Sequence, residues 1–518
     1  MIVARCKEFK MTRTLVLLRL MVAIAAVKIS VFAMESSFQQ QHESDPQRSV
    51  SSQHESTSHG RQFSSDPQRD LQSYPSFYTK YDHYPPYCAL PDDMGGRRIP
   101  PLKDYLPKSG SHNEGDSKNK SLIGETRLVH VTAIIRHGAR TPWSSELKCW
   151  DGYWESQQTG KWDCDDLTTF MAPPSRNATV YDHPPTTPLL FEKKYDALSH
   201  PEDSLANVLN GTCQMGQLIQ QGYGQQIQNG KILRDAYAYK EGEYEHDERM
   251  RLLNINMDSN SDKKHPFLPW QNPQQLYFRA DDYQRTIMSG QILLRSLFDP
   301  ELQSYQETHP DKSVVIPLHI ADEDKDILDA NNKDCPLLKT IKAEALSSPE
   351  YQAFNNSQNS QEVREYMQSK LGMGDDSSPL DCLMCTVCTD RALPDSVDDY
   401  DGTEKNWFTR LTEYDIQKDT VVMKYNNAQH SKLAMGPLWY EIMVNINNAI
   451  GRKPSPKLAL FAGHDTTLMP LLASLGPDLW KDTEWAAYAS MMLIEVGFWI
   501  VTYCSVVHYF GSMDYCWF

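Results

Sequence analysis

The chain is short of positive charge. Its 51 lysine and arginine residues stand against 68 aspartate and glutamate residues among 518, which gives a net charge of -17 at pH 7. A nucleic-acid-binding protein needs a basic face, so this balance argues against one. The same deficit means that a binding site for an anion has to gather its positive charge locally.

Long apolar runs are also scarce. The run from Leu20 to Val27 is flanked by Arg19 and Lys28, and it is short and interrupted for a membrane-spanning helix. Basic residues before a short apolar core, with small residues after it, are typical of a secretory signal peptide. We therefore predict a signal peptide over residues 1–33. The alternative is an uncleaved signal anchor, which would be the only contact with a membrane.

Aliphatic residues are nearly missing from residues 34–85, which are rich in Ser, Gln, His, Asp and Arg. Such a segment cannot bury enough apolar surface to fold, so we predict a disordered linker. The folded part is expected at 86–518, long enough for a large core. Within it, the spacing of apolar residues predicts helices over 213–239 and 433–450.

Cysteine is present in an odd number, eleven, and Cys6 lies in the predicted signal segment. In a secreted chain the other ten are expected to form disulfides, with the pairing left open. Cys382, Cys385 and Cys388 raise zinc as an alternative, but a fourth ligand is missing, so we predict no metal. Four Asn-x-Ser/Thr sequons are compatible with a secretory route to a secreted or Golgi-type lumenal location: Asn119, Asn177, Asn210 and Asn355.

The clearest chemistry follows the apolar, β-branched run from Leu128 to Ile135, which predicts a buried strand. The next seven residues, 136–142, read Arg-His-Gly-Ala-Arg-Thr-Pro. In α/β proteins, ligands bind at the carboxyl ends of strands, and arginine forks match phosphate oxygens. A histidine held through one ring nitrogen can attack phosphorus. The pattern indicates a phosphate site with His137 as nucleophile and with Arg136 and Arg140 as ligands of phosphate. The alternative is a basic turn with a structural histidine.

A second strand-turn-helix segment lies near the end of the chain. Lys457–Ala462 predicts a strand, and apolar spacing from Leu468 predicts a helix. Between them, His464 lies where a helix N-terminus attracts an anion. Asp465 is a candidate general acid, because the departing oxygen of an ester needs a proton. Its alternative role is that of a helix cap.

A third segment has the same organisation. The strand predicted at 275–279 runs into a helix whose first turn contains Arg285. An arginine there opposes the helix dipole and needs an anionic partner. Bound phosphate is the favoured partner, and a surface salt bridge to Asp281 or Asp282 is the alternative. We predict Asp281 as the N-cap of this helix.

The sequence Arg-His-Gly-x-Arg-x-Pro at 136–142, together with the His464-Asp465 pair, resembles the signature of the histidine acid phosphatases, branch 2 of the histidine phosphatase superfamily. The middle motif of that family is matched loosely, by Arg279, Asp282, Arg285, Thr286 and Ser289. The resemblance extends from about 125 to 497. Stretches such as Cys385-Thr386-Val387-Cys388 look most like the 2-phosphoxylose phosphatase and acid phosphatase-like group. The tail at 498–518 does not resemble the family.

The resemblance implies an α/β fold of the phosphoglycerate-mutase type, with a central mixed sheet flanked by helices and an inserted, mostly helical cap mainly at 323–425. It implies a phosphohistidine on His137, proton donation by Asp465, and no cofactor. The implied phosphate ligands are Arg136, Arg140, Arg285 and His464.

The expected function is that of an acid phosphatase-type hydrolase of phosphate monoesters on a small molecule, a sugar or a glycan. A phytase-like enzyme would want more basic residues, and a phosphomutase suits the secretory signals less well. The alternative from another class is a catalytically inactive secreted protein that binds phosphate or glycan.

Overall fold

The computed structural model describes most of the predicted folded region and one short segment before it. The predicted linker at 34–85 lies outside the described residues, as does most of the predicted signal segment. Within the described residues, no helix has the length and apolar character needed to span a membrane. The described residues are 25–32, 88–100, 125–143, 162–164, 167, 170–171, 191–194, 211–238, 249–253, 275–308, 310, 314–374, 378–389, 391, 393, 397, 406–476 and 485–500.

The centre of the molecule is a six-stranded mixed sheet with the strand order β1-β8-β2-β7-β5-β6. Strands β2, β7, β5 and β6 are parallel, whereas β8 is antiparallel to both of its neighbours, β2 and β1. The mixed sheet is therefore confirmed, together with the three strands expected beside the motifs. The strands are β1 (Ala25–Phe32), β2 (Glu125–Arg136), β5 (Leu276–Ala280), β6 (Leu318–His319), β7 (Leu458–Gly463) and β8 (Met491–Ile500).

Three parallel strands end side by side at one edge of the sheet. Arg136 at the end of β2 is paired with Gly463 at the end of β7. Ala280 at the end of β5 is paired with Ala462 of β7. Each polar motif begins where one of these strands stops, so the register of the sheet brings three distant parts of the sequence to the same edge.

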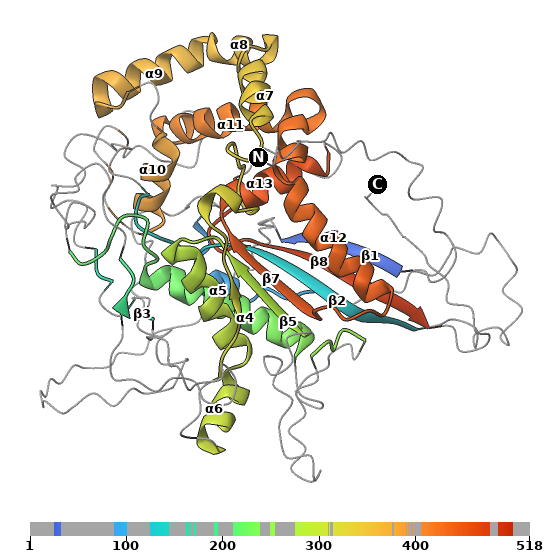
Figure 1. Ribbon diagram of the computed structural model, residues 1–518. Coiled ribbons are helices and arrows are strands. Elements are labelled where there is room, and N and C mark those ends of the chain that lie inside the picture. Colours follow the sequence, from blue (N-terminus) through green and yellow to red (C-terminus); the bar gives the residue numbers. More distant parts are fainter. Residues whose placement is uncertain are drawn as a thin grey trace, which may run out of the picture.

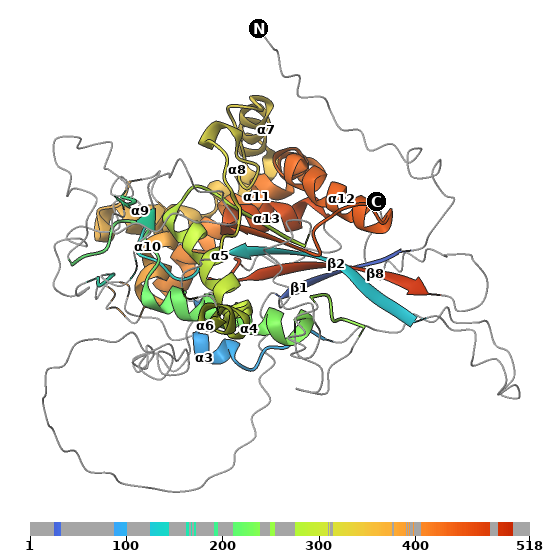
Figure 2. The ribbon, with the colours of Figure 1, turned by 60° about the horizontal axis from the view of Figure 1, so that its bottom comes forward.

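Helices cover both faces of the sheet (Figures 1 and 2). Helices α4 (Gln220–Tyr237) and α5 (Gln284–Leu297) pack on one face, and α12 (Gly436–Ile450) and α13 (Asp465–Ser474) pack on the other. Alternate residues of β2 supply the two cores: Ile135 packs in the core with α4 and α5, and Ile134 packs in the core with α12 and α13. This alternation is the period of two expected of a strand that is buried on both faces.

A group of helices fills the region in which the cap was expected, and Figure 1 shows it beside α13. Tyr425 to Ala428 interrupt the helical conformation of α11. The helices are η4 (Glu323–Lys325), α7 (Leu337–Leu346), α8 (Pro349–Asn355), α9 (Gln358–Leu371), α10 (Pro379–Val387) and α11 (Trp407–Ala434). The remaining elements are α3 (Pro91–Met94), α6 (Asp299–Thr308) and a two-stranded sheet of β3 (Phe170–Met171) and β4 (Phe191–Glu192).

Two boundaries differ from the sequence prediction. The helix expected from residue 213 begins only at Gln220, because Gly216 adopts a left-handed φ of +67° and Leu218 forms a β-bridge to Arg140. Strand β8 continues to Ile500, so the first three residues of the tail belong to the sheet. Strand β1, which pairs with β8, lies within the segment predicted to be a signal peptide.

Candidate active site

The loop that follows β2 is fixed through its backbone to β7 and α5. The His137 N–H donates to the Gly463 carbonyl at 3.0 Å, and the Gly138 N–H donates to Ser289 Oγ at 3.1 Å. Gly138 also lies directly against Gly222 of α4. A Cβ at Gly138 would be 2.5 Å from the Gly222 carbonyl oxygen, so only glycine allows this approach.

The imidazole of His137 is held in one orientation. Its Nδ1 lies 2.8 Å from the Gly138 carbonyl oxygen, and because a carbonyl only accepts, Nδ1 must carry the proton. The lone pair is then on Nε2. Burial lowers the pKa of His137 well below its usual value, and the charges of Arg285, Arg140 and Arg136 lower it further. The ring is therefore a neutral imidazole with a free basic nitrogen, which is the form that can act as a nucleophile.

Arg140 is bound to a carboxylate from the helical region. Its Nη2 lies 2.7 Å from Asp381 Oδ1 of α10, and its Nη1 donates to the Thr141 carbonyl at 3.0 Å. Burial lowers the pKa of Arg140, but the charge and hydrogen bond of Asp381, together with the acidic groups of Cys385 and Tyr488, raise it overall. The Nε of Arg140 is buried and has no hydrogen-bond partner in the described part of the chain. A buried donor without a partner is costly, which makes this guanidinium a candidate to bind an anion.

Arg285 packs against two aromatic rings that also contact each other. Its guanidinium carbon is 4.3 Å from the ring centroid of Trp143 and 4.4 Å from that of Tyr283. Neither Asp281 nor Asp282 forms an ion pair with it, so the surface salt bridge considered as an alternative is not present. Burial and the charge of Arg140 lower the pKa of Arg285 to about 10, which still leaves the side chain charged at neutral pH.

The N-cap prediction for Asp281 is wrong. The N-cap of α5 is Tyr283, and the Asp281 carboxylate turns instead to the histidine of another motif. His464 Nε2 lies 2.7 Å from Asp281 Oδ2, and His464 Nδ1 lies 3.5 Å from Arg285 Nη2. Burial and the Arg285 charge lower the pKa of His464 to about 3, and burial raises the pKa of Asp281. A neutral His464 thus donates from Nε2 and presents Nδ1 to Arg285.

Asp465 is the first residue of α13, and His464 is the N-cap, so Asp465 does not cap the helix. Its Oδ2 accepts from Arg136 Nη2 at 2.9 Å and from Trp485 Nε1 at 2.7 Å. Burial raises the pKa of this carboxyl, but the charge of Arg136 and the Trp485 hydrogen bond outweigh it and lower the pKa to about 2. Arg136 is fully buried and lies with its guanidinium 4.4 Å from the Tyr488 ring centroid.

The structure thus brings the six predicted residues to the same edge of the sheet. The ring centroids of His137 and His464 are 5.4 Å apart. Arg285 contacts His464, and Asp465 pairs with Arg136. Sequence reasoning missed Asp381, for which no local signal exists because it lies 241 residues after Arg140. It also missed the contact of Trp143 with Arg285.

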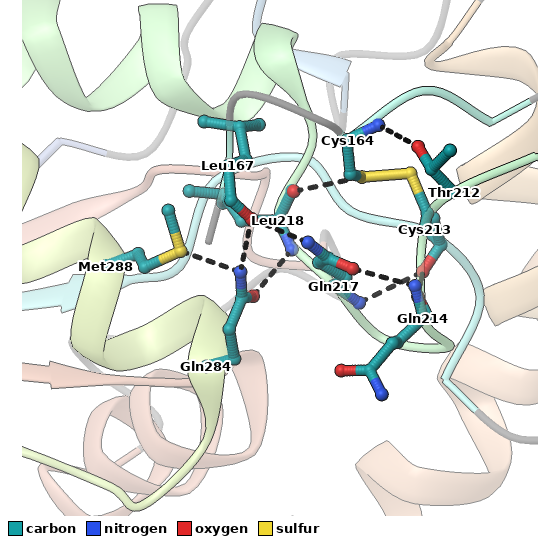
Figure 3. The surroundings of a disulfide bond; sticks show 10 residues. Cys164, Leu167, Thr212, Cys213, Gln214, Gln217, Leu218, Gln284 and Met288 are labelled. Atoms are coloured by element: carbon teal, nitrogen blue, oxygen red, sulfur yellow. Dashed lines mark hydrogen bonds between the residues drawn. A yellow bond between two sulfur atoms is a disulfide. The ribbon is translucent and has the colours of Figure 1, made fainter. Parts of the chain in front are cut away.

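Disulfides hold two segments of this site. Cys164–Cys213 fixes the segment that pairs with Arg140, where Gln217 donates to the Leu167 carbonyl at 2.7 Å (Figure 3). Cys88–Cys388 fixes the end of α10.

Cys382 and Cys385 of α10 and Cys388, the C-cap of this helix, do not form a three-thiol metal site. Cys388 and Cys382 are both disulfide-bonded, as expected, while Cys385 is a buried free thiol, so the expectation of a disulfide is wrong for Cys385. Burial and the charge of Asp381 raise the pKa of the Cys385 thiol to about 12. Its Sγ lies 3.0 Å from the Tyr488 hydroxyl.

Comparison with known proteins adds a family. Residues 127–500 match the family described as "Histidine phosphatase superfamily (branch 2)". Counting factor 60 of Dictyostelium discoideum is 27% identical over 71% of this chain and 76% of its own length. The 2-phosphoxylose phosphatase 1 of Xenopus tropicalis is 23% identical over 77% of this chain and 70% of its own length.

Two further similarities complete the comparison. Bovine lysosomal acid phosphatase is 27% identical over 43% of this chain, and the chain spans about half of that relative, 52%. Among solved structures, the phosphate complex of the multiple inositol polyphosphate phosphatase of Bifidobacterium longum is 11% identical, with a TM-score of 0.40, over 78% of this chain and 86% of that one.

Proposed function

The chain belongs to branch 2 of the histidine phosphatase superfamily, and from that premise we propose that it hydrolyses phosphate monoesters through a phosphohistidine on His137. The observation that carries the proposal is the state of the His137 ring. A neutral imidazole, oriented by the Gly138 carbonyl and surrounded by the charges of three arginines, is suited to attack a phosphorus atom bound by those arginines.

In the first step, the lone pair of His137 Nε2 forms a bond to phosphorus while the bond from phosphorus to the ester oxygen breaks. Asp465 gives its proton to the departing oxygen. The negative charge of bound phosphate offsets the Arg136 charge that lowers the pKa of Asp465 in the free site. The carboxyl can therefore be protonated when the substrate is present.

In the second step, water attacks the phosphohistidine. The oxygen of water forms a bond to phosphorus, the N–P bond breaks, and the Asp465 carboxylate takes the proton that water loses. The arginines, with Arg285 held against Trp143 and Tyr283, neutralise the phosphate oxygens in both transition states.

His464 contributes a donor that depends on phosphate. In the free site Arg285 faces its Nδ1 at 3.5 Å. When phosphate occupies the guanidinium donors, its negative charge favours uptake of a proton at Nδ1. The imidazolium then donates to phosphate through Nδ1 and to Asp281 through Nε2.

We further propose that the substrate is a phosphorylated sugar or glycan in the lumen of the secretory pathway. The similarity to a 2-phosphoxylose phosphatase supports a sugar phosphate. The similarity to a lysosomal acid phosphatase and the disulfides support a lumenal location.

The test is hydrolysis of an aryl phosphate by wild type and by His137→Ala. We expect turnover by the wild type and none by the variant, with the circular dichroism spectrum unchanged. An inactive phosphate-binding protein would bind inorganic phosphate without turnover, and that result would refute the proposal. A second variant, Asp465→Asn, should slow the release of poor leaving groups more than good ones; equal slowing would count against Asp465 as the acid.

A further inference from the structure

Trp143 is linked both to the loop of residues 136–142 and to the helical region. It is the residue after the motif at 136–142, and its backbone N–H donates to Asp381 Oδ2 at 3.0 Å. The other oxygen of the same carboxylate accepts from Arg140 at 2.7 Å. Asp381 therefore fixes the backbone of Trp143 relative to a guanidinium of the proposed phosphate site.

The indole ring lies against the guanidinium of Arg285, another arginine of the proposed phosphate site. Arg285 contacts its face, and Tyr283 packs against it in a T-shaped arrangement, with ring centroids 4.9 Å apart. Gly216 leaves room at the ring edge, since a Cβ there would be 2.7 Å from Trp143 Cε3. These contacts hold the ring in place, so little conformational entropy remains to be lost when a ligand binds to it.

Despite these contacts, Trp143 remains 38% exposed, whereas Arg285 beside it is 6% exposed. Exposed single aromatic residues are common, so exposure alone decides nothing. What matters is the position, because this exposed ring borders a guanidinium that would hold the phosphate of a substrate.

When phosphate is bound to Arg285, the leaving group of the substrate lies close to this guanidinium. Phosphate bound to Arg285 connects through one ester oxygen to the rest of the molecule. The negative face of an indole attracts the polarised C–H groups of a sugar ring or the edge of an aryl ring, and a linear chain offers it less matched area. Trp143 and Tyr283 are both uncharged, so they suit a ring without further phosphate groups.

We propose that the exposed surface of Trp143 is the subsite for the ring that carries the phosphate, and that it selects ring-bearing monoesters over linear ones. This inference rests on the proposed function and names the substrate class of the same site. The ring is either a pyranose or an aryl group, and a sugar phosphate and an aryl phosphate used as separate substrates distinguish the two.

The experiment compares kcat/KM for α-D-glucose 1-phosphate, phenyl phosphate and glycerol 1-phosphate. Trp143→Ala should lower kcat/KM for a ring ester by about 3- to 10-fold relative to glycerol 1-phosphate, with the change mainly in KM. Loss confined to glucose 1-phosphate identifies a sugar as the natural ring, and loss confined to phenyl phosphate identifies an aryl group. Trp143→Phe should restore most of the preference. Tyr440→Ala is the matched control, since Tyr440 is an aromatic residue of α12 with 66% exposure, and it should leave all three values unchanged.

Inorganic phosphate separates the subsite from a purely structural role, because it has no ring. Its inhibition constant should change less in Trp143→Ala than the KM of the ring esters. An equal loss on all three esters, with an equal rise in the phosphate inhibition constant, would mean that Trp143 only supports Arg285. Unchanged ratios in an active Trp143→Ala variant would also overturn the subsite and would leave the proposed function standing. A wild type that hydrolyses none of the three esters would refute both.

Discussion

Replacing Asp281 with asparagine tests how the two histidines of the site divide their work. The variant keeps the size of the side chain and an oxygen that accepts from His464 Nε2, but it removes the negative charge 2.7 Å from the ring. If His464 takes up a proton when phosphate binds, the charge of Asp281 stabilises that imidazolium. A hydrogen bond to a charged group contributes about 1.5–3 kcal/mol. At 1.4 kcal/mol per factor of ten, kcat/KM should fall by roughly 10- to 100-fold.

The pH dependence of kcat should shift in a defined direction. Without the Asp281 charge, the pKa of His464 in the phosphate complex is lower, and the imidazolium is lost at a lower pH. The alkaline limb of the kcat profile should therefore shift to lower pH in Asp281→Asn. The assay is hydrolysis of an aryl phosphate between pH 4 and 8. The control is Asp282→Asn, in the next residue, whose side chain is 50% exposed and pairs with Lys193; we expect a change within about 2-fold for such an exposed pair. A change just as small in Asp281→Asn, with an unshifted profile, would refute the assigned role.

Three further predictions concern the stability of the site. Gly138→Ala should lower the free energy of unfolding by about 1–3 kcal/mol in urea denaturation, because its Cβ would collide with the Gly222 backbone; an unchanged midpoint would contradict the close approach. Cys213→Ser should destabilise the chain by about 4 kcal/mol, the chain-entropy value for a closed loop of 49 residues, and a thermal melt that matches the wild type would contradict the bond. The folded pKa of Asp465 is depressed to about 2, so its stabilising contribution is full above the unfolded value near 3.8 and is lost as the pH falls toward 2. The stability difference between wild type and Asp465→Asn should therefore shrink by about 2 kcal/mol over that interval; a constant difference would contradict the Arg136 pair.

Much of the site could be predicted because its parts are local in the sequence. A buried strand that ends in a polar motif can be recognised from a few residues, and β2, β5 and β7 each follow this pattern. Parallel strands place their carboxyl ends at the same edge, so the convergence of three motifs followed from the strands alone. The residues placed in this way are those that follow Arg136, Ala280 and Gly463.

The errors arose where tertiary contacts outweigh local preferences. Asp281 has the residue type and the position of an N-cap, but its carboxylate is held by His464, 183 residues later. The helix predicted from 213 starts late, since its first residues are bound by a disulfide and by a bridge to Arg140. Asp381 could not be found from the sequence, because nothing in α10 indicates that a carboxylate one turn before Cys385 reaches the phosphate loop.

The most direct test of the account is to trap the covalent intermediate. The protein is mixed with a ³²P-labelled phosphate monoester, denatured within the first turnovers, and digested to locate the label. We predict an acid-labile, alkali-stable phosphate on the Nε2 of His137 that is absent from His137→Ala. A label on any other residue, or turnover by the wild type with no labelled protein at any time, would contradict the central claim.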